Sequence, residues 1–133
     1  MENPLKIGDL AREVDVPIST LRYYERSGLL APARRTESNY RLYSSESVER
    51  VRFIRSAQAA GFTIADIRAL LELRDGDTTR CAEVRPVIEH RLSQVAERIE
   101  EFEHFQRALR AFLDICSRTD NDDDCGAIEQ LRP

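Results

Sequence analysis

The sequence contains few of the residues that interrupt regular structure. Only 5 Gly and 5 Pro occur among 133 residues, which predicts a mainly helical chain with few turns. No apolar run is long enough to span a bilayer, and the N-terminus lacks the apolar segment of a signal peptide. These absences argue against a membrane protein and predict a cytoplasmic one.

Catalytic patterns are also missing. We find no nucleophile–base pair, no phosphate-binding loop and no catalytic metal motif, so an enzyme is not expected. The cysteines number 3, an odd count that does not suit a disulfide framework in a reducing compartment. Thiolate chemistry and simple burial are the two roles left for them.

Charge is distributed unevenly along the chain. The formal net charge is −4, yet residues 20–55 contain eight Arg against four Glu, a local charge of +4. Acidic residues dominate after residue 75. A basic head on an acidic tail is typical of a local phosphate-binding surface.

The N-terminal region predicts two short helices and a turn. Apolar residues at helical spacing indicate a helix over Ile7–Val14, which Asp15-Val16-Pro17 ends. Pro17 suits the first turn of a second helix, and Gly28 ends that helix. This layout is a helix-turn-helix.

Residues 31–43 change character. Turn-forming residues precede Tyr40-Arg41-Leu42-Tyr43, in which Tyr40 and Leu42 alternate with Arg41 and Tyr43. The pattern predicts a short hairpin, or wing, that contacts phosphates and the minor groove. A simple connector is the alternative.

Two further helices should support this head. Ser44 and Ser45 can cap a helix over residues 46–60, which Gly61 ends. Thr63 and Asp66 form a capping-box pattern that begins a fourth helix. We assign residues 1–75 to a winged helix-turn-helix DNA-binding domain and residues 76–80 to a linker.

The next segment carries a heptad repeat. Apolar residues recur in steps of four and three, and only Gln106 interrupts them; the predicted dimer seam is Ile88, Leu92, Val95, Ile99, Phe102, Leu109 and Leu113. Such a seam over about four heptads predicts a coiled-coil dimerisation helix at residues 81–116. Pro86 fits best in a first turn, so regular helix should start near Ala82 or Glu83.

The cysteine positions predict an antiparallel pairing of two chains. Cys81 and Cys116 lie 35 residues apart, roughly 50 Å along a helix, and cannot share an ion within one chain. If Cys81 of one chain faces Cys116 of its partner, paired residue numbers sum to 197, which also places Val95 opposite Phe102. The seam and the cysteines therefore agree on one two-fold dimer.

That dimer would have one metal site at each end. Each site would hold one metal ion and take ligands from both chains. The ligands would be Cys81 of one chain with Cys116 and Cys125 of the other, the last two joined by a loop within residues 117–133. Three thiolates favour mercury, cadmium, lead or zinc. Asp122–Asp124 is expected to be a solvated loop, or else the source of an oxygen ligand.

Candidate DNA contacts cluster on the second helix and the wing. Hydroxyl, Arg and Tyr side chains there suit phosphate and base-edge contacts; they are Ser19, Thr20, Arg22, Tyr23, Tyr24, Arg26, Tyr40 and Arg41. Tyr23 and Tyr24 are adjacent and cannot both face the core, so we expect one of them to be exposed.

Several blocks resemble the MerR family of transcriptional regulators. They are Lys6-Ile-Gly-Asp-Leu-Ala, Thr20-Leu-Arg-Tyr-Tyr-Glu-Arg-Ser-Gly-Leu-Leu, Asn39-Tyr-Arg-Leu-Tyr and Val51-Arg-Phe-Ile-Arg-Ser-Ala-Gln. The resemblance implies a winged-helix homodimer that binds double-stranded promoter DNA between widely spaced promoter elements. It implies repression without metal, and activation when metal binding distorts the DNA so that RNA polymerase engages both elements.

Within that family, a Cys at the head of the dimer helix resembles the sensors of divalent ions, so Cys81 argues against copper. The cysteine spacings of 35 and 9, with Ser56-Ala-Gln58 and Arg74-Asp-Gly76, look like the mercury branch. Mercury(II) is the first expectation, then cadmium or lead, then zinc. The alternatives are a redox or organic effector, and a coiled-coil module with inert buried thiols.

Overall fold

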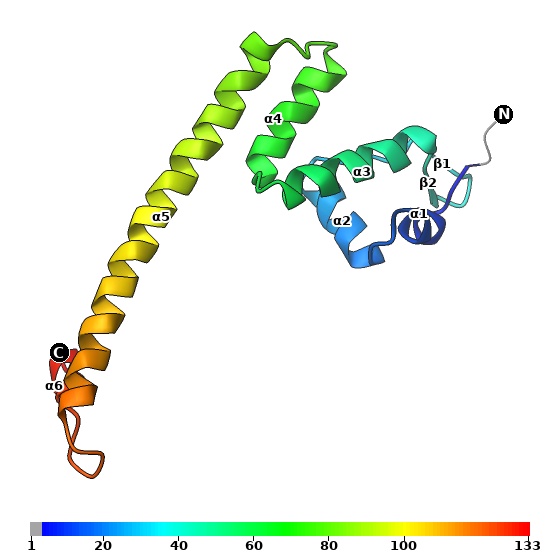
Figure 1. Cartoon of the computed structure of the whole chain (residues 1–133). Coiled ribbons are helices and arrows are strands. Elements are labelled where there is room, and N and C mark those ends of the chain that lie inside the picture. Colours follow the sequence, from blue (N-terminus) through cyan, green and yellow to red (C-terminus); the bar gives the residue numbers. More distant parts are fainter. Residues whose placement is uncertain (1–3) are drawn as a thin grey trace. The chain divides into compact units, whose positions relative to one another are not determined.

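A computed structural model describes residues 4–133 of the chain, which is mainly helical (Figure 1). In chain order its elements are α1 (Ile7–Val14), α2 (Ile18–Arg26), β1 (Arg34–Arg35), β2 (Arg41–Leu42), α3 (Ser45–Ala59), α4 (Ile64–Asp75), α5 (Cys81–Arg118) and α6 (Gly126–Leu131). The chain divides into two compact units, one ending at residue 91 and the other spanning 92–133.

The turn between α1 and α2 confirms the helix-turn-helix prediction. Asp15 adopts a left-handed conformation with φ 55°, and the Val16 N–H donates to the Ala11 carbonyl at 3.1 Å. Pro17 lies immediately before α2 as its N-cap, one position earlier than a first-turn residue. At the other end Gly28 takes φ +77°, a conformation that costs Gly little because it has no Cβ.

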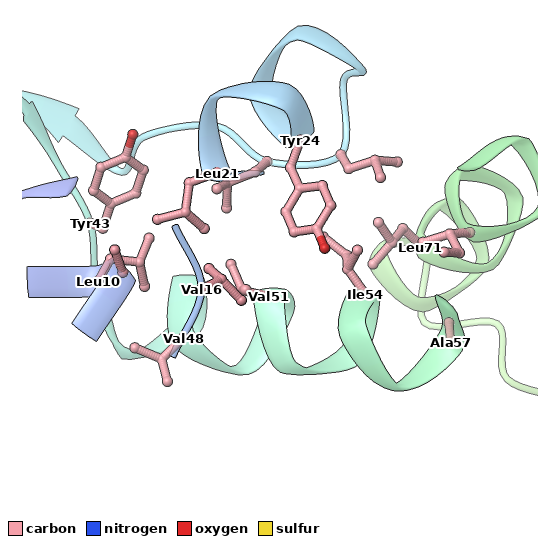
Figure 2. Packing of buried hydrophobic residues seen from close by; sticks show 14 residues of the cluster. Leu10, Val16, Leu21, Tyr24, Tyr43, Val48, Val51, Ile54, Ala57 and Leu71 are labelled. Atoms are coloured by element: carbon pink, nitrogen blue, oxygen red, sulfur yellow. The ribbon is translucent and has the colours of Figure 1, made fainter. Parts of the chain in front are cut away.

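The core of the N-terminal unit is formed by α1–α4 (Figure 2). Helix α1 packs against α2 and α3, and α3 packs against α4. All four helices contribute deeply buried aliphatic side chains; these include Leu10, Leu21, Val51, Ile54, Ile67 and Leu71. This shared core fixes α2 relative to the rest of the unit.

The wing is a two-stranded antiparallel hairpin. Arg34 pairs with Leu42 and Arg35 pairs with Arg41. Its turn closes at Asn39, which has φ 67°, a left-handed conformation that Asn tolerates better than most residues. The predicted alternation through Tyr43 was wrong: Leu42 and Tyr43 are both buried, because the chain turns inward after β2 and Tyr43 pairs with Leu5 through hydrogen bonds of 2.7 and 2.9 Å.

The helix caps follow the sequence closely. The Asp66 N–H donates to Thr63 Oγ1 at 3.2 Å, and the Thr63 N–H donates to Asp66 Oδ2 at 3.0 Å, which confirms the predicted capping box. Ser44 caps α3, where the Ser44 N–H donates to Ser47 Oγ at 3.1 Å.

The first turns of α5 belong to the N-terminal unit. Arg91 Nε donates to the Gly61 carbonyl at 2.5 Å and ties α5 to the turn between α3 and α4. The compact unit ends at residue 91. Helix α5 starts at Cys81 rather than at Ala82 or Glu83, so Pro86 lies beyond the first turn, where it cannot donate a hydrogen bond to the carbonyl of Ala82.

The C-terminal unit contains the rest of α5 and the short helix α6, which folds back beside the end of α5 (Figure 1). Ala127 of α6 is buried. A Cβ added at Gly126 would lie 3.2 Å from Ile115 Cγ2, so Gly allows α6 to approach α5 closely. Among the described residues, no helix is both long and apolar enough to cross a membrane.

Truncating the core of α2 should destabilise the N-terminal unit. Leu21 is fully buried, so Leu21→Ala should lower the free energy of unfolding by about 2–5 kcal/mol through lost burial and a cavity. Ile18, on the same helix, is 37% exposed, and Ile18→Ala should cost about 1 kcal/mol or less. Urea unfolding curves would test this; equal losses for the two variants would contradict the packing described.

Candidate DNA interface and candidate metal centre

A basic groove of about 860 Å³ lies between α1, α2 and the wing. Six cationic side chains line it against two acidic ones, a local charge of +4; the cations are Lys6, Arg12, Arg22, Arg26, Arg35 and Arg41. The acids are Asp9 and Glu25. A groove with this balance attracts a polyanion, although the chain as a whole is acidic.

Helix α2 presents most of the predicted DNA contacts at its surface. Ser19, Arg22, Tyr23 and Arg26 are exposed, and Thr20 is half-buried. Arg22 and Arg26 line the groove. A helix surface rich in Arg and hydroxyl groups can contact both phosphates and base edges.

Tyr24 is a correction to the predicted interface. Its ring is 1% exposed and lies in the core between α2 and α3 (Figure 2). The Tyr24 hydroxyl donates to Gln58 Oε1 of α3 at 2.6 Å. Helical geometry turns consecutive side chains by about 100°, so Tyr24 faces inward while its neighbour Tyr23 stays 45% exposed.

In the wing, Tyr40 and Arg41 differ in their surroundings. Tyr40 is 64% exposed, and Lys6 Nζ lies 5.8 Å from the centre of its ring, a cation–π contact. Arg41 is half-buried, and its Nη1 lies 3.1 Å from Glu25 Oε2. The predicted DNA contacts did not include Lys6, Arg12, Arg35 or Glu25; the concentration of Arg within residues 20–55 was the available sequence signal for Arg35.

Two of the three cysteines meet within one chain. Cys116 lies near the end of α5 and Cys125 is the N-cap of α6, and their Sγ atoms are 2.7 Å apart. All three cysteines are free thiols; Cys81 and Cys116 are exposed and Cys125 is half-buried. The packing of α6 against α5 therefore brings Cys116 and Cys125 together, although a loop separates them in the sequence.

The paired thiols differ in acidity. The hydrogen bond with Cys116, followed by a backbone hydrogen bond from Ala127, lowers the pKa of Cys125 below its ordinary value. The hydrogen bond with Cys125 in turn raises the pKa of Cys116. The hydrogen bond between the two thiols therefore favours a single thiolate in the pair, and the thiolate is the form that binds soft metal ions.

Cys81 is separate from this pair. It begins α5, whereas Cys116 lies near the other end of the same helix. No group of three or more Cys, His, Asp or Glu side chains suited to a metal ion occurs within residues 4–133 of a single chain. Asp122, Asp123 and Asp124 are exposed in the loop before α6.

The seam of α5 is uncovered in the single chain. Leu92, Ile99, Phe102, Leu109 and Leu113 are each more than half exposed. The described part of α5 contains no buried residue. A long helix with an open apolar stripe needs a partner surface to remove that stripe from water.

Comparison with known proteins settles the family. The model described as "MerR HTH family regulatory protein" matches residues 5–73, and a second, "MerR, DNA binding", matches residues 48–112. The chain belongs to the MerR family of DNA-binding transcriptional regulators. This confirms the resemblance, the fold class and the expectation that the chain is not an enzyme.

Relatives of this MerR-family chain include regulators named for metals. It is 37% identical to the HTH-type transcriptional regulator ZntR of Escherichia coli K12, over 86% of this chain and 82% of that one. It is 34% identical to the mercuric resistance operon regulatory protein of Bacillus cereus, over 95% and 96%. The lead(II)-bound crystal structure of the regulator PbrR691 from Ralstonia metallidurans CH34 matches with a TM-score of 0.82 and 34% identity, over 96% and 99%. These similarities place the chain in the metal-sensing branch of the family.

The two adjacent tyrosines of α2 give opposite predictions. Tyr24→Phe should lower the free energy of unfolding by about 1 kcal/mol, because the hydrogen bond to Gln58 is lost. It should leave the affinity of the folded protein for DNA unchanged. Tyr23→Phe should weaken DNA binding without changing stability. Thermal unfolding and fluorescence anisotropy with duplex DNA separate the two effects; weaker binding by folded Tyr24→Phe alone would contradict the assignment.

Proposed function

We propose that this MerR-family chain is a homodimeric regulator that controls a heavy-metal resistance promoter in response to a soft divalent metal ion. The 2.7 Å approach of Cys116 Sγ to Cys125 Sγ carries the proposal, because it supplies two thiol ligands at one point. The relatives named for mercury resistance and solved with lead(II) support a soft metal as effector.

The third ligand in this proposal is Cys81 of the partner chain. Cys81 is exposed at the first position of α5, where a second chain can approach it. An antiparallel pairing of two α5 helices would cover the open seam and bring Cys81 of each chain toward Cys116 and Cys125 of the other. The register that pairs these cysteines also pairs two sets of seam residues, Val95 with Phe102 and Ile88 with Leu109.

The metal is proposed in the order mercury(II), then cadmium or lead, then zinc. Only thiols converge at the candidate centre, and a thiol-only donor set favours soft ions over harder ones. Zinc accepts thiolates but usually completes four-coordination, and Asp122–Asp124 is the nearby source of an oxygen ligand in the sequence.

On DNA, the basic groove and α2 would hold the promoter duplex through contacts from Ser19, Thr20, Arg22, Tyr23, Arg26, Tyr40 and Arg41. We propose that the dimer represses without metal. With metal it would distort the duplex so that RNA polymerase engages both promoter elements; the energy of DNA deformation then acts as the switch.

An ultraviolet titration tests the metal proposal directly. Reduced protein is titrated with mercury, cadmium, lead and zinc in turn, in the presence of excess small-molecule thiol. We expect thiolate-to-metal absorption bands that saturate at one ion per chain, with mercury bound most tightly.

Variants give the matched controls. Cys81→Ser, Cys116→Ser and Cys125→Ser should each weaken binding strongly, whereas His104→Ala, an exposed residue on α5, should bind as the unmodified chain does. The absence of a saturable band with any of the four ions would leave a DNA-binding dimer with inert thiols and would refute the proposal.

A further inference from the structure

Glu25 is an acidic residue in a groove suited to phosphate. Its side chain is 12% exposed, compared with 41% for Asp9, the other acid of the groove. A carboxylate beside bound DNA repels the phosphates and lowers affinity. Its presence at this position calls for a role that outweighs this repulsion.

The Glu25 carboxylate joins α2 to the wing through two contacts. The Tyr43 hydroxyl donates to Glu25 Oε1, and Arg41 Nη1 lies 3.1 Å from Glu25 Oε2. The backbone of Tyr43 is fixed as well, because its N–H and its carbonyl both form hydrogen bonds with the backbone of Leu5. One side chain of α2 is therefore bonded to two of the three last residues of the wing.

Tyr43 is a permanent donor in this arrangement. Burial raises the pKa of the Tyr43 phenol well above its ordinary value, and the hydrogen bond from Tyr43 to Glu25 raises it further. The hydroxyl stays protonated at any pH at which the protein works. The contact with Glu25 is thus constant and holds the carboxylate in place.

Arg41 lies beside another cation and is stabilised by the negative charge of Glu25. Its direct neighbour across the hairpin is Arg35, and like charges at opposed positions of an antiparallel pair destabilise it. Glu25 offsets that repulsion. Arg41 remains 40% exposed, and a guanidinium carries five N–H donors, so the contact with Glu25 leaves donors free for a phosphate.

We propose that Glu25 is a positioning residue for DNA binding: it fixes Arg41 and the wing against α2 so that both elements contact the same duplex. This inference rests on the proposed contact of Arg41 with phosphate. It predicts that removing a negative charge from the groove weakens binding, the opposite of what simple electrostatics predicts.

Glu25→Gln separates these two expectations. Glutamine can still accept the Tyr43 hydrogen bond, but it loses the charge that holds Arg41. With a duplex selected from random-sequence DNA by the unmodified chain, the affinity should fall about tenfold, as for loss of a charge-assisted contact. The slope of log affinity against log salt should fall by about one.

Glu49→Gln is the matched control. Glu49 Oε2 lies 3.9 Å from Arg74 Nη2, so this variant also removes the acid of a Glu–Arg ion pair, but the pair lies outside the groove. DNA binding by this variant should be unchanged. If Glu25→Gln also binds as tightly as the unmodified chain or more tightly, the positioning role is refuted.

Two further measurements exclude a general loss of fold. Hydroxyl-radical footprints with Glu25→Gln should lose protection at the wing positions and keep it at the positions contacted by α2. In a double-mutant cycle, Glu25→Gln should cost little once Arg41 is replaced by Ala, because it acts through Arg41. Additive losses would overturn the inference.

Should Glu25→Gln fail to fold, Arg41→Lys keeps the charge but removes the planar guanidinium. The inference predicts the same selective loss of wing protection for this variant. A full footprint would refute it. If Arg41→Ala itself leaves affinity unchanged, the proposed phosphate contact of Arg41 fails, which is distinct from failure of the positioning role.

Discussion

The length of helix α5 limits which thiols of this protein can meet at one point. Cys81 and Cys116 belong to the single helix α5, whose rise of about 1.5 Å per residue keeps them roughly 50 Å apart. One chain therefore offers only the Cys116–Cys125 pair at any one point, and a three-thiolate centre requires a second chain. The open seam of α5 has the same requirement. In the proposed account, dimerisation and metal binding depend on one another through this helix.

The DNA-binding head is governed by a different balance. An acidic chain binds a polyanion only if its cations are gathered, and the groove between α1, α2 and the wing does so with a local charge of +4. The core formed by α1–α4 sets the position of α2, and Glu25 connects α2 to the wing. Arg91, bonded to Gly61, ties the start of α5 to the same unit. Cys81 lies at this end of α5. A movement of Cys81 would therefore be passed through the first turns of α5 to the N-terminal unit.

Much of the N-terminal fold could be predicted from the sequence, because helical periodicity and capping residues are strong local signals. Periodicity gave α1 at its observed bounds, and the Thr63–Asp66 capping box placed the start of α4. Side-chain direction was harder: Tyr23 and Tyr24 are chemically alike, and only the packing of α2 on α3 decides that Tyr24 is buried. Long-range pairs such as Glu25 with Arg41 leave no periodic trace in the sequence. The seam and the Cys81 partnership concern a second chain, and they remain predictions.

The most direct test of the shared centre uses mixed dimers of Cys81→Ser and Cys116→Ser chains, purified with two different affinity tags. If each site takes Cys81 from one chain and Cys116 with Cys125 from the other, one site of the mixed dimer is intact and the other lacks two ligands. The account predicts one mercury ion per mixed dimer, bound with the affinity of the unmodified protein, while neither parental homodimer binds comparably. Mixed dimers that bind no metal at that affinity would contradict it.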